Sequence, residues 1–139
     1  MASADELRQG ITTNRQALRD AIEAAADKWE VGDDDNWAPR KVAEHCIGAD
    51  IRFAGMIAGA LQSKAPESSE LSFVSSADAA SGLDAAAGAS DKVLRYIEDR
   101  DLAKPAPLPD GIPFEKNIEG VLKLAAYHLN DHAGQIGSA

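Results

Sequence analysis

Apolar residues recur at spacings of three, four and seven positions in four separate segments of this chain, a pattern typical of amphipathic α-helices. In the first segment, for example, Leu7, Ile11, Leu18 and Ile22 share one helix face. Such faces are buried when helices pack against one another. The pattern therefore predicts an all-α four-helix bundle, with helices over residues 5–29, 39–62, 77–99 and 113–136.

Length and charge limit the class of protein. The 139 residues suffice for a single domain, residues 1–139, with a sizeable core. With 14 basic and 23 acidic residues, the net charge of -9 repels nucleic-acid phosphates and anionic membranes. No apolar run approaches the ~20 residues of a membrane span, and the opening MASADELRQG lacks a signal-peptide pattern. Because the single cysteine, Cys46, also forms no internal disulfide, we expect a cytoplasmic protein that binds neither nucleic acid nor membrane.

The second predicted helix is apolar on two sides. Besides the stripe that contains Val42 and Cys46, a second stripe is formed by Ile47, Ile51, Ala54 and Ala58. A helix that is apolar on both sides is buried on both sides. In one domain of this size, the second stripe predicts a partner subunit and hence a homodimer.

Three histidines occur in the chain, and all fall on the apolar faces of predicted helices. His128 and His132 are four residues apart, so they share one face of the last helix. His45 lies ~9 Å after the start of the second helix, and the midpoint of the other two lies ~9 Å before the end of the last helix. Antiparallel helices with level ends would therefore bring the three rings to one height. Three neutral imidazoles with an open position suit a divalent transition metal such as zinc, nickel or iron.

Other interpretations of these histidines fit the sequence less well than a metal site. A single histidine on an apolar face is more often a core residue with a hydrogen-bond partner. Three imidazoles at one depth would each need such a partner, whereas one metal ion satisfies all three. A zincin helix needs Glu directly after its first His, where Leu129 stands, and a di-iron bundle needs Glu three residues before His. The positions three residues before the histidines hold Val42, Ala125 and Leu129 instead of Glu. A mononuclear three-histidine site is therefore favoured.

The proposed site also constrains the topology. In an up-down-up-down bundle, the start of the second helix and the end of the fourth lie at opposite ends, which would separate His45 from the other histidines. One connection must therefore cross the length of the bundle, which gives an up-down-down-up arrangement. The second helix would be ~36 Å long, and a loop of about 14 residues reaches ~46 to 50 Å when extended. Either long connection, residues 63–76 or residues 101–113, could make this crossover.

Two tracts of the sequence are similar to motifs of a known family. The Trp, Pro, Val and His signature that opens the second helix of the DinB/YfiT-like metal-dependent proteins resembles NWAPRKVAEHCIGAD in this chain. Their closing helix, in which two His one turn apart precede Gly-Gln-Ile, is similar to AAYHLNDHAGQIG. The four-helix layout matches over the whole chain, although only these two motifs are specific. The resemblance implies a bundle, usually dimeric, with a nickel or zinc ion held by His45, His128 and His132.

The resemblance also implies a thiol-dependent reaction. Family members with known activity are chiefly transferases that attach bacillithiol or mycothiol to electrophiles, together with a mycothiol-dependent maleylpyruvate isomerase. Those isomerases carry an extra C-terminal domain and often a Glu at the position of His128, so that branch fits this chain less well. Ala38, just before Pro39, stands where Ser or Thr is common in the family.

Together these features predict a metal-dependent thiol S-transferase that uses a low-molecular-weight thiol on an electrophilic substrate, with the metal lowering the pKa of the thiol. The alternatives are a non-catalytic dimeric bundle that binds a metal or a small ligand, and an enzyme like the maleylpyruvate isomerase. No residue pair resembles an independent nucleophile and base, so the catalytic residues are left unassigned.

Five further residues lie near the predicted site. Asp131 and Gln135 could orient a ligand ring, or could simply be exposed. Cys46 points ~100° away from His45 around the helix and is expected in the core. Trp29 and Trp37 flank the turn at the end of the site, where they either line a pocket or pack against the bundle.

Overall fold

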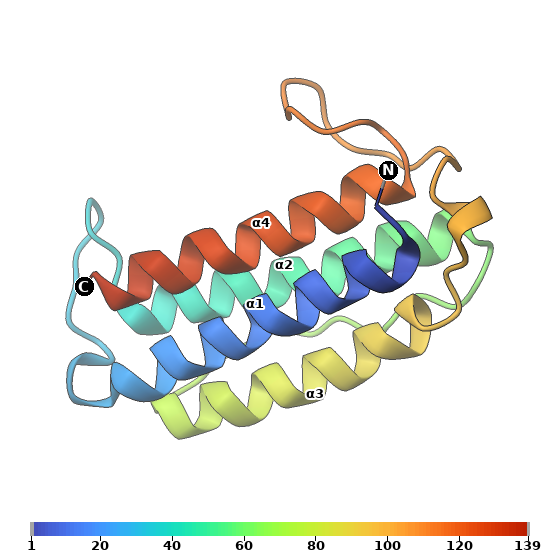
Figure 1. Ribbon diagram of the computed structural model, residues 1–139. Coiled ribbons are helices and arrows are strands. Elements are labelled where there is room, and N and C mark those ends of the chain that lie inside the picture. The colour runs from blue at the N-terminus through green and yellow to red at the C-terminus, as the bar shows by residue number, and fades with distance from the viewer. Residues whose placement is uncertain (1, 139) are drawn as a thin grey trace.

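The computed structural model describes residues 2–138 and contains four α-helices and no strand within that range. The helices form a bundle, as Figure 1 shows, which confirms the predicted all-α four-helix fold. Two short 3-10 helices, η1 (Ala26–Lys28) and η2 (Asp99–Asp101), follow the first and third helices. The α-helices are α1 (Ala4–Ala24), α2 (Pro39–Ala60), α3 (Ser76–Leu94) and α4 (Ile118–Gly137).

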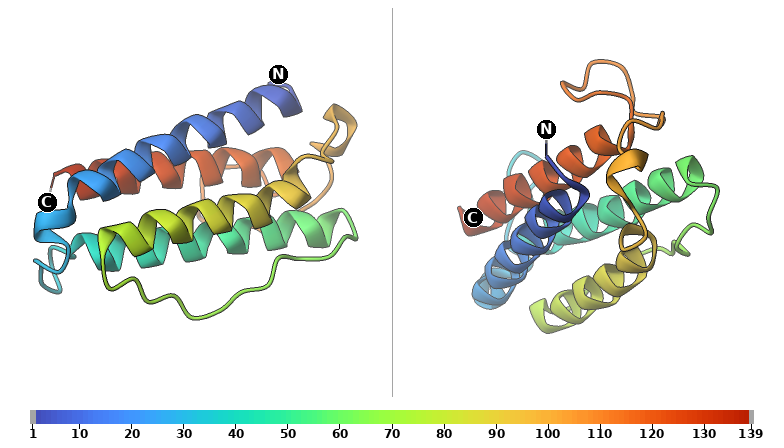
Figure 2. Two further views of the ribbon diagram at one scale, coloured as in Figure 1. Left: turned by 90° about the horizontal axis from the view of Figure 1, so that it is seen from below. Right: turned by 45° about the vertical axis from the view of Figure 1, so that its right-hand side comes forward.

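The bundle has the predicted up-down-down-up topology. Helices α1 and α4 run in one direction and α2 and α3 in the other (Figure 1). The crossover is the connection over residues 61–75, which follows the length of the bundle from the end of α2 to the start of α3 (Figure 2). Helix α2 packs against α3 and α4, and α1 packs against the same two helices. The start of α2 and the end of α4 therefore lie at the same end of the molecule, as the histidine site requires.

Side-chain caps define where three of the helices begin. Ser3, Ser75 and Asn117 each accept a hydrogen bond from a backbone N–H in the first turn of α1, α3 and α4. Helix α2 instead begins with Pro39, whose fixed φ suits a first helical position, and Ala38 provides no side-chain cap.

The last helix begins five residues later than predicted, at Ile118 rather than Pro113. The preceding loop passes very close to the first turn of this helix. A Cβ atom on Gly120 would lie only 1.8 Å from the carbonyl oxygen of Glu115. Phe114, which was placed on the inner face of this helix, therefore lies in the loop and is partly buried. The first and third helices are also shorter than predicted, since they end at Ala24 and Leu94.

The second apolar stripe of α2 is covered within one chain. Ile47 and Ala58 are 0% exposed and Ala54 is 2% exposed. Within the chain, α2 packs against both α3 and α4. The prediction that a partner subunit must cover the stripe is therefore wrong, and a homodimer stays a prediction without this support.

Hydrogen bonds hold the crossover against the bundle. The indole Nε1 of Trp29 donates to the carbonyl oxygen of Phe73 at 2.8 Å, and the backbone N–H of Phe73 donates to a carboxylate oxygen of Glu44 at 2.8 Å. The Phe73 ring packs directly over Gly82 of α3, where a Cβ atom would lie 2.3 Å from the ring. Of the two interpretations of Trp29, lining a pocket or packing against the bundle, the structure supports packing.

A buried ion pair links three of the helices. Arg15 of α1 donates from Nε to Asp50 of α2 at 3.0 Å and from Nη1 to Asp91 of α3 at 2.9 Å. Arg15 and Asp50 are 7% and 4% exposed. Most of the remaining core is aliphatic and is dominated by Ile11, Leu18, Ile22, Ile57, Leu122, Leu129 and Ile136. None of the helices within residues 2–138 has the length and apolar character needed to cross a membrane.

Candidate metal centre

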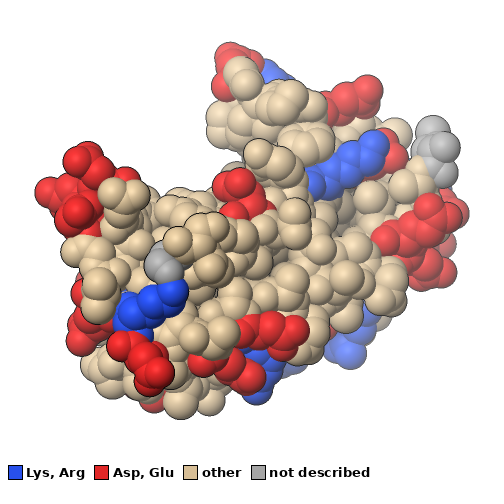
Figure 3. Space-filling model, turned by 60° about the vertical axis from the view of Figure 1, so that its left-hand side comes forward, with Lys and Arg blue, Asp and Glu red and all other residues tan. Residues whose placement is uncertain are grey.

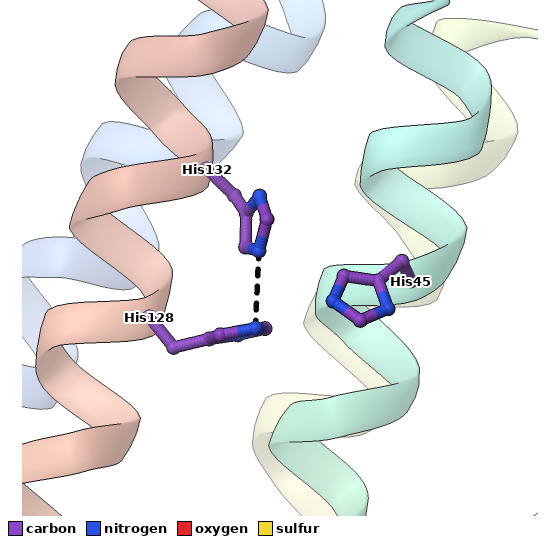
Figure 4. A group of neighbouring side chains, drawn as sticks. All are labelled: His45, His128 and His132. Carbon is purple, nitrogen blue, oxygen red and sulfur yellow. Dashed lines mark hydrogen bonds between the residues drawn. The ribbon is translucent and has the colours of Figure 1, made fainter. Parts of the chain in front are cut away.

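The three histidines lie together between α2 and α4, near the end of the bundle where α4 ends. His45 comes from the second turn of α2, and His128 and His132 come from successive turns of α4 (Figure 4). One ring nitrogen from each lies within 4.8 Å of one from each of the others. The predicted matching of their depths along antiparallel helices is therefore observed, whereas metal binding itself stays a prediction.

The separation of the ring nitrogens is compatible with a shared ion. The Nε2 atoms of His128 and His132 are 3.0 Å apart. Two nitrogens bound to one ion at ~2.1 Å are about 3.0 Å apart at a right angle and about 3.4 Å apart at the tetrahedral angle. The ring of His45 has its centre 5.1 Å from that of His128 and 5.0 Å from that of His132. The donor set thus fits a divalent transition metal.

The site is more open than the sequence suggested. His45 is exposed and the two histidines of α4 are half-buried, so the expectation that all three point inward is wrong for His45. On α2 the buried positions on either side of it, Val42 and Cys46, face the core, whereas His45 lies at the rim between α2 and α4. An ion held here would be reachable from solvent.

The hydrogen bond of His132 sets the tautomer of its ring. Its Nδ1 lies 2.7 Å from Oε1 of Gln135, an amide oxygen that can only accept, so Nδ1 carries the proton. The Nε2 atom is then unprotonated, and its lone pair points toward Nε2 of His128, with which it forms a hydrogen bond at 3.0 Å. This arrangement is typical of metal-binding histidines, whose second nitrogen donates to a neighbouring group. Of the two candidate orienting residues, Gln135 contacts the ring of His132, whereas Asp131 influences His128 through its charge.

The environment keeps two of the imidazoles neutral. The pKa of His128 is lowered to about 4, chiefly by burial and also by the neighbouring His132 and His45, against the opposing charge of Asp131. Burial also lowers the pKa of His45, helped by the charges of His132 and Arg52. Metal binding requires the neutral imidazole, so these rings are in the ligand form near neutral pH.

Cys46 lies in the core beside the site, as predicted. Its side chain is 0% exposed, and its sulfur lies 3.9 Å from Nδ1 of His128. The pKa of the Cys46 thiol is raised to about 12, chiefly by burial and also by the carboxylates of Asp50 and Asp131. The group is therefore a neutral thiol next to the ring of His128, on the side of that ring away from His132.

Aromatic side chains border the three histidines on two sides. Trp37 meets the ring of His45 edge-on at a centroid distance of 5.7 Å, and Phe53 meets the ring of His128 edge-on at 5.6 Å. Trp37 therefore lines the site, which was one of its two interpretations. Phe53 was not identified as a site residue from the sequence, although its position eight residues after His45 places it about two turns further along the same face of the helix.

Positive charge also lies beside the site in this acidic chain. The Lys41 ammonium lies 4.4 Å above the centre of the Trp37 ring, and Arg52 is close enough to lower the pKa of both His45 and His128. Arg52 has no ion pair among residues 2–138. Acidic side chains gather on protruding parts of the end of the molecule seen in Figure 3, and the hollow between them is mostly uncharged.

Comparison with protein families identifies the family of the chain. The model of the DinB superfamily matches residues 10–136, a range that contains all of α2 and α3, most of α1 and α4, and the three histidines. A search of curated proteins and a search of solved structures gave no match. Since the family model covers nearly the whole chain, the chain belongs to the DinB superfamily.

Proposed function

We propose that His45, His128 and His132 bind one divalent transition metal, zinc, nickel or iron, and that the protein is a metal-dependent thiol S-transferase. The observation that carries the proposal is the convergence of the three imidazoles at a place that remains open to solvent at His45. A closed site would suit a structural metal, whereas an open position suits exchange of reactants. Membership of the DinB superfamily supports the same proposal.

In the proposed reaction, a small thiol reacts with an electrophilic carbon. The metal, when bound, acts as a Lewis acid that lowers the pKa of the thiol. A sulfur–carbon bond forms, and the electron pair leaves with a departing group or is taken up with a proton at the adjacent carbon. No side chain has to act as nucleophile, which agrees with the absence of a reactive thiol at the site, because Cys46 is buried and un-ionised.

The residues around the histidines support binding of an anionic reactant. Phe53 and Trp37 provide aromatic walls, and Arg52 and Lys41 provide positive charge on the same side of α2. Several low-molecular-weight thiols, such as glutathione and bacillithiol, carry carboxylates, and Arg binds a carboxylate through two parallel hydrogen bonds. Gln135 holds the ring of His132 in the tautomer that leaves Nε2 free.

Thiol conjugation by the purified protein tests this proposal. The protein would be loaded with zinc, nickel or iron and assayed with cysteine, glutathione, bacillithiol and mycothiol against a generic electrophile such as monochlorobimane. We expect turnover that disappears on chelation and in the His128→Ala variant. The Asn130→Ala variant is the matched control, since Asn130 is exposed on the same helix between the two histidines.

The same assay distinguishes the alternatives. Stoichiometric metal with no turnover for any thiol would indicate a non-catalytic bundle that binds a metal or a small ligand. Turnover with maleylpyruvate but not with other electrophiles would indicate an isomerase. A cytoplasmic location and a homodimer are also part of the proposal, and light scattering at micromolar concentration tests the second.

A further inference from the structure

A second group of cations lies far from the histidines and forms no ion pair within residues 2–138. Eight basic residues form ion pairs within residues 2–138, and Lys41 lies over Trp37. Apart from Arg52 at the histidine site, the basic residues with no ion pair in this range include Lys64, Lys92 and Arg95. These three residues line one cavity.

The cavity lies between the start of the crossover and the last turns of α3. Its volume is about 800 Å³, which is within the usual range for sites that bind small molecules. The end of α2 and the end of α3 meet at the end of the bundle opposite the chain's C-terminus (Figures 1 and 2). Leu61, which lines the cavity, is ~24 Å along α2 from His45, so the cavity is separate from the histidine site.

The three cations are not needed to stabilise the end of α3. Cations at a helix C-terminus interact favourably with its last carbonyl groups. Here Arg8 of α1 already donates to the carbonyl oxygens of Leu94 and Ile97, at 3.0 and 2.7 Å. Lys92 and Arg95 are three residues apart on one helix face, where like charges repel. Lys92 and Arg95 therefore add little to the stability of the helix. Lys64 lies in the crossover and is not part of α3.

The lining of the cavity combines this charge with apolar surface. Pro66, Val93 and Leu61 provide aliphatic contacts, and the ring of Tyr96 is 68% exposed at its edge. The Arg95 guanidinium lies 5.2 Å from the centre of that ring. Glu67 is the one acidic residue among those that line the cavity, so the lining is net positive in a protein of net charge -9.

We propose that this cavity binds a small organic anion with an aromatic or other flat apolar body and a carboxylate, sulfonate or phosphate group. The anionic group pairs with Lys92, Arg95 and Lys64, and the apolar body lies against Val93 and Tyr96. The proposal concerns a site separate from the histidines and does not rest on the thiol transferase reaction.

Binding of naphthalenesulfonate to the zinc-loaded protein tests the proposal, because a sulfonate is a poor metal ligand. Backbone amide NMR shifts on titration should be confined to residues 61–67 and 89–96. The neutral analogue naphthalenemethanol and inorganic phosphate should each bind at least about tenfold more weakly, since each lacks one of the two kinds of contact. Equal binding of either one would overturn the proposed ligand class.

A charge-matched pair of variants completes the test. Lys92→Gln combined with Arg95→Gln should weaken naphthalenesulfonate binding by about tenfold or more, because both side chains are exposed and the fold does not depend on them. Lys116→Gln combined with Lys123→Gln makes the same change in net charge at another surface and should change the affinity by less than about twofold. Equal weakening in both double variants would mean that net charge alone causes the effect, and this would overturn the site. Amide shifts centred on His128 would overturn it as well.

Discussion

The Nδ1 atom of His132 lies 2.7 Å from Oε1 of Gln135, three residues further along α4. This contact decides which ring nitrogen is free, since the amide oxygen can only accept and the proton must stay on Nδ1. The Nε2 atom is then left with its lone pair facing His128, 3.0 Å away. Gln135 therefore prepares one ligand of the candidate metal centre although it cannot reach the ion through that oxygen itself.

Loss of this contact should weaken metal binding without unfolding the protein. Gln135→Ala removes the acceptor from an exposed position, and we expect zinc affinity to fall by about tenfold, the lower end of the usual range for such supporting residues. Gln135→Glu retains an acceptor for Nδ1–H and should restore most of the affinity. Competition with a chromophoric chelator measures both, and equal affinities in Gln135→Ala and the parent protein would remove Gln135 from this role.

Each of the three histidines should be needed for stable metal binding. Replacing His45, His128 or His132 with Ala leaves two imidazoles, and we expect metal content after gel filtration to fall from near one ion per chain to a small fraction of that. The control is Asn130→Ala, which should keep its metal. Near-stoichiometric metal in His45→Ala would show that the exposed histidine is not a ligand. Circular dichroism should stay close to that of the parent, because packing supplies most of the helical stability.

The helices and the meeting of the histidines could be predicted from the sequence because both follow from helical geometry. Residues four apart share a face, and equal depths on antiparallel helices bring His45 to the height of His128 and His132. The same reasoning led to the up-down-down-up topology. What it could not decide was which of two long connections crosses the bundle, since both are long enough.

The remaining differences arise from tertiary packing. The stripe that contains Ile47 is buried within one chain, in which α2 packs against α3. The crossover is attached to the bundle through Phe73, and the apolar residues Leu71, Phe73 and Val74 in this connection were a signal in the sequence. Asn117, a good N-cap residue, was likewise a signal for the later start of α4. The exposure of His45 had no local signal, because a helix with apolar residues around much of its circumference does not reveal which side α4 leaves uncovered.

A charge at Ile47 should destabilise the monomer itself. This side chain is 0% exposed within one chain, so Ile47→Glu buries a carboxylate without a partner and should cost about 4 kcal/mol or more in the free energy of unfolding. Ile51→Glu, one turn away at a partly exposed position, should cost clearly less. Urea denaturation measures both. A folded Ile47→Glu protein that changes only its mass in light scattering would instead place this residue at a subunit interface.

Cys46 should be unreactive in the folded protein. A buried thiol with a pKa of about 12 has almost no thiolate at pH 8, and the thiolate is the reactive form. We expect alkylation at least about a hundredfold slower than in urea-unfolded protein. A Cys46→Ala, Ser81→Cys variant provides an exposed thiol on α3 for comparison and should react at once. Fast modification of Cys46 under native conditions would show that the core beside His128 opens readily.

The stability of the metal-free protein should depend on pH through His128. Its pKa is lowered from 6.5 to about 4 in the folded protein, so between these values the unfolded chain binds more protons than the folded one. Stability from this group is therefore complete above about pH 6.5 and is lost as the pH falls toward 4. Because the ring is only half-buried and partly screened by solvent, we expect the loss to be about 1 to 2 kcal/mol.

Comparison with a variant isolates this contribution from the carboxylates that titrate over the same range. His128→Gln keeps a polar side chain but cannot take up the proton, so in the presence of a chelator its urea midpoint should fall less than that of the parent between about pH 7 and pH 4.5. Parallel pH profiles of the two proteins would contradict the lowered pKa. A steeper profile in His128→Gln would mean that the histidine is protonated more readily in the folded state than in the unfolded chain, which neither its burial nor the neighbouring His45 and His132 would explain.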